Sequence, residues 1–293
     1  MMNRGFTLIE LAIVLFIIAL MTHLAVREAG KIRDSKQASA AERQFDEIAA
    51  AVYDEAGGEP SGFLADMGRL PRSAAQNADA PEVFSPCELW LRGDLPPFRL
   101  REACGDGYCG EAPEDPAVKI PCGWRGPYLR LPAGGDTLRD PWGNPFVSKD
   151  AAGFCRILDC GGGEIAEAGV ALGALRHFGS DGLPDNRKRP ARFDQADRTF
   201  DIAPSNAATC VVQVLFTDAD GMYAAGVVSR LDRYFICEGL VTGAVAEVSG
   251  FGCVVTNPAP GVCCFRAETS SGVRYRRLAL RPGTNPDFLF RIE

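Results

Sequence analysis

The chain begins with an apolar segment that constrains its fold more than any other feature. Residues 6–26 contain no Lys or Arg, and this run of 21 residues is close to the roughly 20 needed to span a bilayer as a helix. No proline occurs before Pro60, and Gly30 is the only glycine in residues 6–56. We therefore expect one helix of about 51 residues, roughly 75 Å long, that ends at Gly57-Gly58.

The second half of this helix is amphipathic. Apolar residues recur there at spacings of three and four, at Ala38, Ala41, Phe45, Ile48, Ala49, Val52 and Ala56. This spacing predicts a stripe that packs on a globular head. Lys36, Arg43 and Glu47 lie off the stripe and are expected to face solvent.

One carboxylate interrupts the apolar run. Glu10 would cost on the order of 2.5–3.5 kcal/mol near the centre of a membrane-spanning helix, so it needs a partner. A secretory signal peptide or a simple signal anchor is the alternative interpretation of this start. However, a signal peptide has a shorter apolar region of roughly 7–15 residues, and an ordinary anchor gains nothing from Glu10.

The start of the chain resembles the leader of type IV prepilins and of the pseudopilins of type II secretion systems. The matching residues are Gly5, Phe6, Thr7, Leu8, Ile9 and Glu10. The resemblance implies that a prepilin peptidase cuts between Gly5 and Phe6 and methylates the new amino terminus of Phe6. It also implies that Glu10 pairs with the terminal ammonium of a neighbouring subunit during assembly.

The same resemblance implies a location, partners and a function. The chain would be an inner-membrane, single-pass precursor with its head outside the cytoplasm, and then part of a periplasmic or extracellular filament. Its partners would be other pilin or pseudopilin subunits, prepilin peptidase and an inner-membrane assembly platform. The expected function is that of a structural subunit of a type IV filament or a type II secretion pseudopilus. Residues 1–5 would then be the leader and residues 6–57 the helix, with 6–26 transmembrane.

Residues 58–206 are rich in Pro and Gly between short apolar stretches, which predicts a loop-rich α+β head with a Cys-rich insertion at 81–121. Three of its motifs resemble those of major-pseudopilin heads: Gly126–Leu129, Asp140–Phe146 and Phe178–Gly182. In that family the second motif is a turn that links strands of a small antiparallel sheet. Its residues suit a turn, since Pro141 and Pro145 fix φ, Gly143 permits positive φ, Asn144 can bond its own backbone and Trp142 adds buried area.

The resembled family also binds calcium in the loop after the sheet. Asp181 and the pair Asp201-Ile202 match its ligand-bearing elements, and Asp185 and Asp194 lie between them. Asp181, Asp185 and Asp201 are therefore candidate calcium ligands. The segment 186–198 is longer and more basic than the family loop, so its arginines and lysine could instead pair with these carboxylates.

Eleven cysteines lie outside the apolar run, which suits an oxidising compartment and disulfides. Cys104 with Cys109 and Cys155 with Cys160 could each close a small loop. The sequence leaves the pairing open, and the odd count leaves at least one thiol unpaired or intermolecular.

Other function classes find little support. The net charge of −7 argues against nucleic acid, and the basic clusters at 187–192 and 274–277 are interpreted as solvated surface. Gly161–Ala166 fits a nucleotide-binding pattern without a βαβ rhythm around it, so we expect no organic cofactor. His177 is the only histidine beyond the apolar run, and no hydrolase or phosphate-loop motif occurs, which makes a membrane-tethered enzyme the remote alternative.

Residues 207–293 are β-rich and form either a second domain or an extension of the head sheet. Strands are expected at 210–217, 222–229, 231–237, 252–256, 262–267, 273–280 and 288–292, with a hairpin turn at Asp218–Gly221. A minor or tip subunit that binds a surface or a substrate through this region is the alternative function. The predicted fold class is α+β: a long membrane-spanning helix packed on a small antiparallel head, with a β-rich C-terminal extension.

Overall fold

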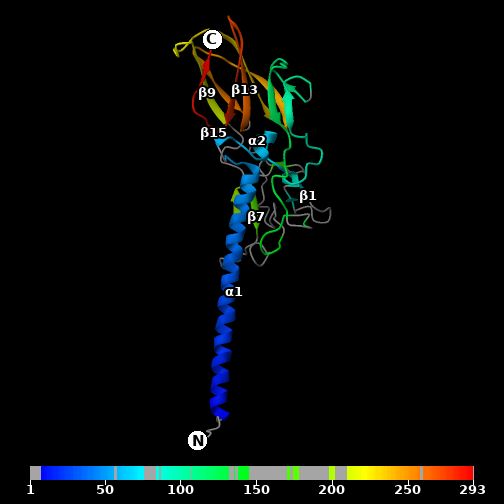
Figure 1. Ribbon diagram of the computed structural model, residues 1–293, viewed down its shortest axis with the longest axis vertical. Helices are drawn as coiled ribbons and strands as arrows, with labels where there is room; N and C mark the ends of the chain where they lie inside the picture. Colours follow the sequence, from blue (N-terminus) through cyan, green and yellow to red (C-terminus); the bar gives the residue numbers. More distant parts are fainter. Residues whose placement is uncertain are drawn as a thin grey trace, which may run out of the picture.

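The computed structural model shows one long helix that carries a β-rich head at its C-terminal end (Figure 1). The structure describes residues 8–55, 58–75, 84–85, 87–105, 107–131, 135, 138–144, 170–171, 174–177, 198–201, 210–257 and 260–292. The α+β architecture predicted from the sequence is confirmed.

Helix α1 runs from Leu8 to Val52 and has two parts of different character. Residues 8–33 are all exposed, whereas the far end is buried against the head at Ala41, Phe45, Ile48, Ala51 and Val52. These buried positions lie on one helical face, which confirms the predicted stripe. Lys36, Arg43 and Glu47 are exposed, as expected.

The helix ends at Val52, before Gly57-Gly58, because tertiary contacts redirect the chain. Asp54 and Ser61 exchange backbone hydrogen bonds of 3.0 and 2.8 Å, which form an antiparallel bridge. Gly62 then packs so closely on the helix end that a Cβ there would lie 2.8 Å from the carbonyl oxygen of Val52. Continued helix would place Asp54 and Ser61 out of reach of each other.

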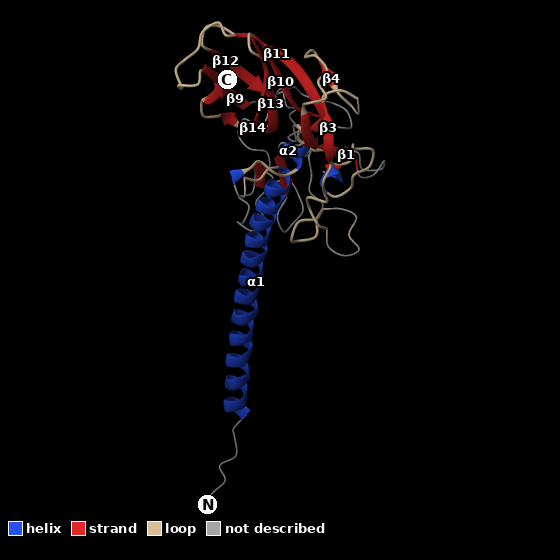
Figure 2. Ribbon diagram, turned by 45° about the horizontal axis from the view of Figure 1, so that its top comes forward, coloured by secondary structure: helices blue, strands red, loops and turns tan. Residues whose placement is uncertain are grey.

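A short buried helix, α2 (Phe63–Met67), lies between the end of α1 and the strands (Figure 2). The part of the head nearest α1 also contains a three-stranded antiparallel sheet, a 3-10 turn and a separate hairpin. Their bounds are β2 (Phe84–Ser85), β1 (Arg72–Ala75) and β6 (Val170–Ala171) for the sheet, η2 (Cys87–Leu89) for the turn, and β7 (Ala174–His177) with β8 (Arg198–Asp201) for the hairpin.

The C-terminal strands form two sheets that pack face to face around a common core. One has the order β14-β13-β10-β11-β4, with bounds Gly272–Leu280, Gly261–Thr269, Val228–Cys237, Leu240–Ala246 and Cys109–Gly110. In the other, β12 (Gly252–Asn257) and β9 (Cys210–Thr217) are antiparallel, and β15 (Gly283–Thr284) and β16 (Phe288–Arg291) pair with β9 in parallel. Alternate β9 residues, Val212, Val214 and Phe216, point into the core.

The later part of the Cys-rich insertion, from residue 99 onward, joins the larger of these two distal sheets, whereas β2 and η2 lie in the part of the head nearest α1. Its strand β4 pairs with β11, with Cys109 opposite Thr242, while β3 (Arg99–Glu102) and β5 (Lys119–Cys122) form a hairpin of their own. A third core joins the insertion to the outer face of the larger sheet, and it contains Ala103, Ala112, Val118, Ile120, Cys122, Tyr234, Ile236, Val241 and Cys264. Segments more than a hundred residues apart in sequence therefore share one hydrophobic core.

Most expected C-terminal strands are present, but the prediction of a hairpin after β9 is wrong. The turn forms, since Asp218 Oδ1 accepts hydrogen bonds from the backbone of Asp220 and Met222 at 3.0 and 2.9 Å. The expected return strand is limited to a bridge between Thr217 and Tyr223. The chain then crosses to the other sheet as β10. Crossing lets the apolar residues of β10 face those of β9 across the core instead of lying beside them.

Candidate assembly surface along the N-terminal helix

The first half of α1 is an apolar surface that no other described residue covers. It carries thirteen exposed large apolar side chains: Leu8, Ile9, Leu11, Ile13, Val14, Leu15, Phe16, Ile17, Ile18, Leu20, Met21, Leu24 and Val26. They occupy every face of the helix, a distribution typical of a helix surrounded by lipid or by other helices. The helix is long and apolar enough to cross a membrane.

The area involved makes an external cover necessary. Full burial of one such side chain is worth roughly 1.5–3 kcal/mol, so covering thirteen that are about half exposed is worth on the order of 10–20 kcal/mol. A folded domain gains only about 5–15 kcal/mol in total. This segment therefore needs a cover, such as a bilayer or other apolar helices.

Glu10 lies in the first turn of this surface. It follows Leu8 and Ile9, which are 88% and 70% exposed, so its carboxylate belongs to an apolar stretch of the helix. A cationic group from another molecule could neutralise it once the surrounding apolar side chains are covered. Gly5 and Phe6, the predicted processing residues, lie outside the described residues.

The head is fixed to α1 by a turn at Asp140–Asn144. Gln44 donates a hydrogen bond of 2.8 Å from Nε2 to the carbonyl of Arg139, and Gln37 donates one of 3.3 Å to the carbonyl of Pro141. These two glutamines lie seven residues apart, which places them on one side of the helix. Sequence reasoning missed both; their spacing, two turns apart beside the apolar stripe, was the available signal.

The turn around Trp142 forms largely as predicted. Gly143 has a φ of 93°, and Trp142 is half-buried. Asp140 supplies the side-chain bonds that Asn144 was expected to provide: its Oδ1 accepts from the backbone of Trp142 and Asn144 at 3.1 and 2.7 Å. Burial raises the pKa of Asp140, while the hydrogen bonds from Asn144, Trp142 and Gly143 act in the opposite direction.

The fold and this surface define a class: a helix-anchored protein whose apolar helix surface is covered by a membrane or by other subunits. The family model described as "Prokaryotic N-terminal methylation motif" matches residues 1–26. The chain thus carries the N-terminal methylation motif of the type IV pilin and pseudopilin family, followed by a long apolar helix. The motif implies processing by prepilin peptidase, a membrane-anchored precursor and an extracytoplasmic head. No curated protein and no solved structure matched the chain.

Among the residues that the structure describes, the candidate calcium ligands do not come together. Asp181, Asp185 and Asp194 lie outside the described residues. Asp201 is opposite Ala174, at the end of the β7–β8 hairpin away from the connecting loop, roughly 10 Å along the strand from that loop. No group of three His, Cys, Asp or Glu residues suited to a metal occurs within the described part of the chain.

The cysteine pair that can be checked is not bonded. Cys104 and Cys109 are both free thiols, and Cys109 is exposed in β4, opposite Thr242. Cys155, Cys160 and the Gly161–Ala166 motif lie outside the described residues. His177 is on β7, opposite Arg198.

Proposed function

We propose that the chain is a structural subunit of a type IV filament or a type II secretion pseudopilus. In this proposal prepilin peptidase removes residues 1–5, and the exposed helix surface from Leu8 to Val26 then leaves the bilayer and packs against the same surface of neighbouring subunits. The observation that carries the proposal is the all-round apolar exposure of this segment. Glu10 would set the register by pairing with the amino terminus of a neighbour.

Filament incorporation tests the proposal. Glu10→Ala and Gly5→Ala should each abolish incorporation while the head stays folded, as judged by circular dichroism and protease resistance. Glu28→Ala is the matched control, because Glu28 also lies on α1 but pairs with Lys31 at 2.6 Å on an exposed face. Unchanged filaments from the Glu10 variant would refute the assembly role.

A second candidate function is that of a minor or tip subunit. The outer face of the smaller distal sheet exposes Val254 (66%) and Leu289 (57%), next to Tyr223 and Phe251, whose rings lie 6.2 Å apart. Exposed apolar side chains of this kind on one sheet face suit contact with a secreted protein or a surface. Antibody labelling only at filament ends, at low copy number, would favour this role over that of a major subunit.

Calcium binding at Asp181, Asp185 and Asp201 remains part of the proposal. All three would supply the oxygen ligands that calcium prefers. Asp201 could take part only if the loop at 178–197 returned along the β7–β8 hairpin.

A further inference from the structure

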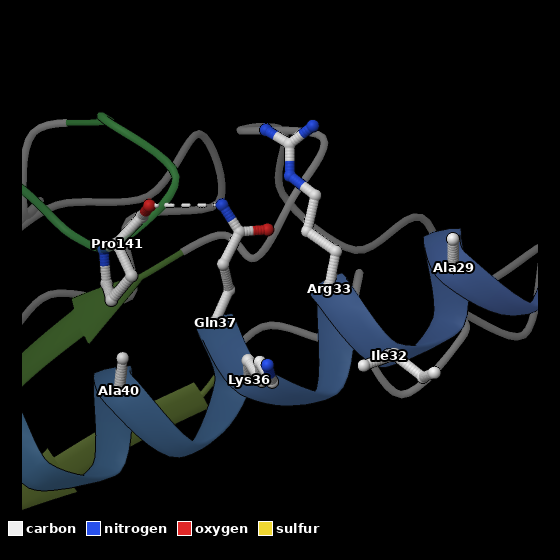
Figure 3. Close-up of a pocket in the computed structure, with 7 residues that line it drawn as sticks. All are labelled: Ala29, Ile32, Arg33, Lys36, Gln37, Ala40 and Pro141. Carbon is white, nitrogen blue, oxygen red and sulfur yellow. Dashed lines mark hydrogen bonds between the residues drawn. The ribbon is translucent and has the colours of Figure 1, made fainter.

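A shallow groove lies where α1 passes the turn at Asp140–Asn144 (Figure 3). Its apolar walls come from Ala29, Ile32 and Ala40 of the helix and from Pro141 of the turn. Figure 3 shows Gln37 bridging the groove at one end, where its amide donates to the carbonyl of Pro141. The groove thus lies at the junction between helix and head.

Two cations line this groove. Among the residues that the structure describes, neither Arg33 nor Lys36 forms an ion pair or a hydrogen bond, whereas nearby Lys31 is paired with Glu28. Apolar walls beside two unneutralised cations suit an amphipathic anion. A purely apolar helix from another subunit would leave both charges unmatched.

The membrane end of the groove lies at the height of the lipid headgroups. The apolar run ends at Val26, so Ala29 is about 5 Å and Arg33 about 10 Å farther along the helix axis. Side chains on a helix lean toward its N-terminus, which here is the membrane side, and long cationic side chains reach toward the interface. The headgroup layer is about 5–7 Å thick on each side of a bilayer, so the side chain of Arg33 can reach its phosphates, and that of Lys36, which starts about 15 Å beyond Val26, reaches only its outer edge.

We propose that this groove binds the phosphate headgroup of an anionic phospholipid in the membrane-anchored precursor. Arg33 and Lys36 contact the phosphate, and the glycerol and upper acyl chain lie along Ala29 and Ile32. The bound lipid covers the helix face below the head until the subunit leaves the membrane. This inference rests on the membrane-anchored orientation in the proposed function, but it does not depend on assembly through Glu10.

Photo-crosslinking of the full chain in nanodiscs tests the site. Benzoylphenylalanine at position 29 would be activated in an equimolar mixture of phosphatidylglycerol and phosphatidylcholine, and the adducts identified by mass spectrometry. We expect phosphatidylglycerol adducts to predominate. Each cation near a membrane surface contributes about a fivefold preference for anionic lipid, so Arg33→Gln with Lys36→Gln should reduce the enrichment roughly ten- to thirtyfold.

The control removes two charges from outside the groove, through Arg27→Gln with Arg43→Gln, and should reduce the enrichment at most about fivefold, because only Arg27 lies near the headgroups. Equal loss in both double variants would show diffuse surface attraction and overturn the site. Equal labelling of the two lipids, or adducts mainly to a second copy of the chain, would also overturn it. Glu10→Ala should leave the lipid adducts unchanged, which separates failure of this inference from failure of the assembly proposal.

Discussion

Arg69 Nε lies 2.6 Å from a carboxylate oxygen of Glu238, a residue 169 positions further along the chain. The same guanidinium donates to both carboxylate oxygens of Glu88, at 2.7 and 2.9 Å. Glu238 has a φ of 54° in the two-residue turn between β10 and β11. Arg69 therefore links the end of α2, the turn η2 and the distal sheet through one buried side chain.

Arg69→Ala should lower the free energy of unfolding by about 3 kcal/mol, mainly because it leaves the carboxylate of Glu88, which is 17% exposed, without its cation; Glu238 is 44% exposed and contributes less. Urea unfolding of the full chain in detergent would measure the loss. Arg281→Ala is the control: its pair with Glu55 is 3.8 Å long and half exposed, so it should cost at most about 1 kcal/mol. Similar losses in both variants would contradict this role for Arg69.

The insertion and the C-terminal strands should unfold together. Tyr275 Oη on β14 donates a hydrogen bond of 2.5 Å to Asp115, which also pairs with Arg266 Nε at 3.0 Å. Tyr275→Phe removes a bond to a charged group and should cost about 1.5–3 kcal/mol.

Hydrogen exchange would measure this coupling. In Tyr275→Phe, protection should fall to the same degree in β5 and in β13, because the two strands contribute to one core. Tyr223→Phe, at a side chain that is 59% exposed, should change neither. Loss of protection confined to β14 would show that the insertion is an independent unit.

Position 68 requires glycine for two reasons: a side chain has no room there, and the backbone is left-handed. A Cβ there would lie 2.0 Å from the carbonyl oxygen of Ile236, and its φ is 70°. Gly68→Ala should therefore destabilise the protein by more than the roughly 1 kcal/mol of a left-handed alanine. Gly93→Ala, with a φ of 53° and open space around it, isolates the conformational part. Equal melting temperatures for the two variants would argue against close packing of α2 on β10.

The carboxyl group of Asp66 should make stability depend on pH. Burial raises its pKa, against the opposing effects of Arg125 and Tyr128, which donate to it at 3.0 and 2.9 Å. A raised pKa means that the folded state binds the proton more tightly than the unfolded chain. The contribution of Asp66 is therefore greatest below the ordinary Asp pKa of about 3.9 and falls as pH rises through the raised value.

Asp66→Asn provides the comparison, since its side chain stays neutral. The free energy of unfolding of the wild type, minus that of Asp66→Asn, should decrease between pH 3 and pH 7 in urea titrations. An increase over that range would mean that the ion pair with Arg125 outweighs burial.

Calcium should raise the melting temperature of the full chain, and Asp181→Ala should remove that rise. Asp218→Ala is a suitable control, because Asp218 is occupied by its own turn. No response to calcium in the wild type would end the proposal of a calcium site.

Local patterns predicted the elements that depend on neighbours in sequence. The long apolar run and the absence of proline were enough for α1, the alternation of residues was enough for β9, and Gly143 and its neighbours were enough for the turn around Trp142. Strand β11 was missed, although the residues Glu238-Gly239 between two apolar runs are a signal for a two-residue hairpin.

The sequence by itself determined an N-terminal helix that cannot be covered by its own chain, because 21 consecutive mostly apolar residues leave no polar face. Only the tertiary structure decided where that helix ends and what its head is made of. The bridge between Asp54 and Ser61 stops α1 at Val52, and the pairing of Cys109 with Thr242 brings the insertion into the distal sheet. The bridge joins residues only seven positions apart but depends on the packing of Gly62 on the helix end, and Cys109 and Thr242 are distant in sequence, so no pattern of neighbouring residues encodes either contact.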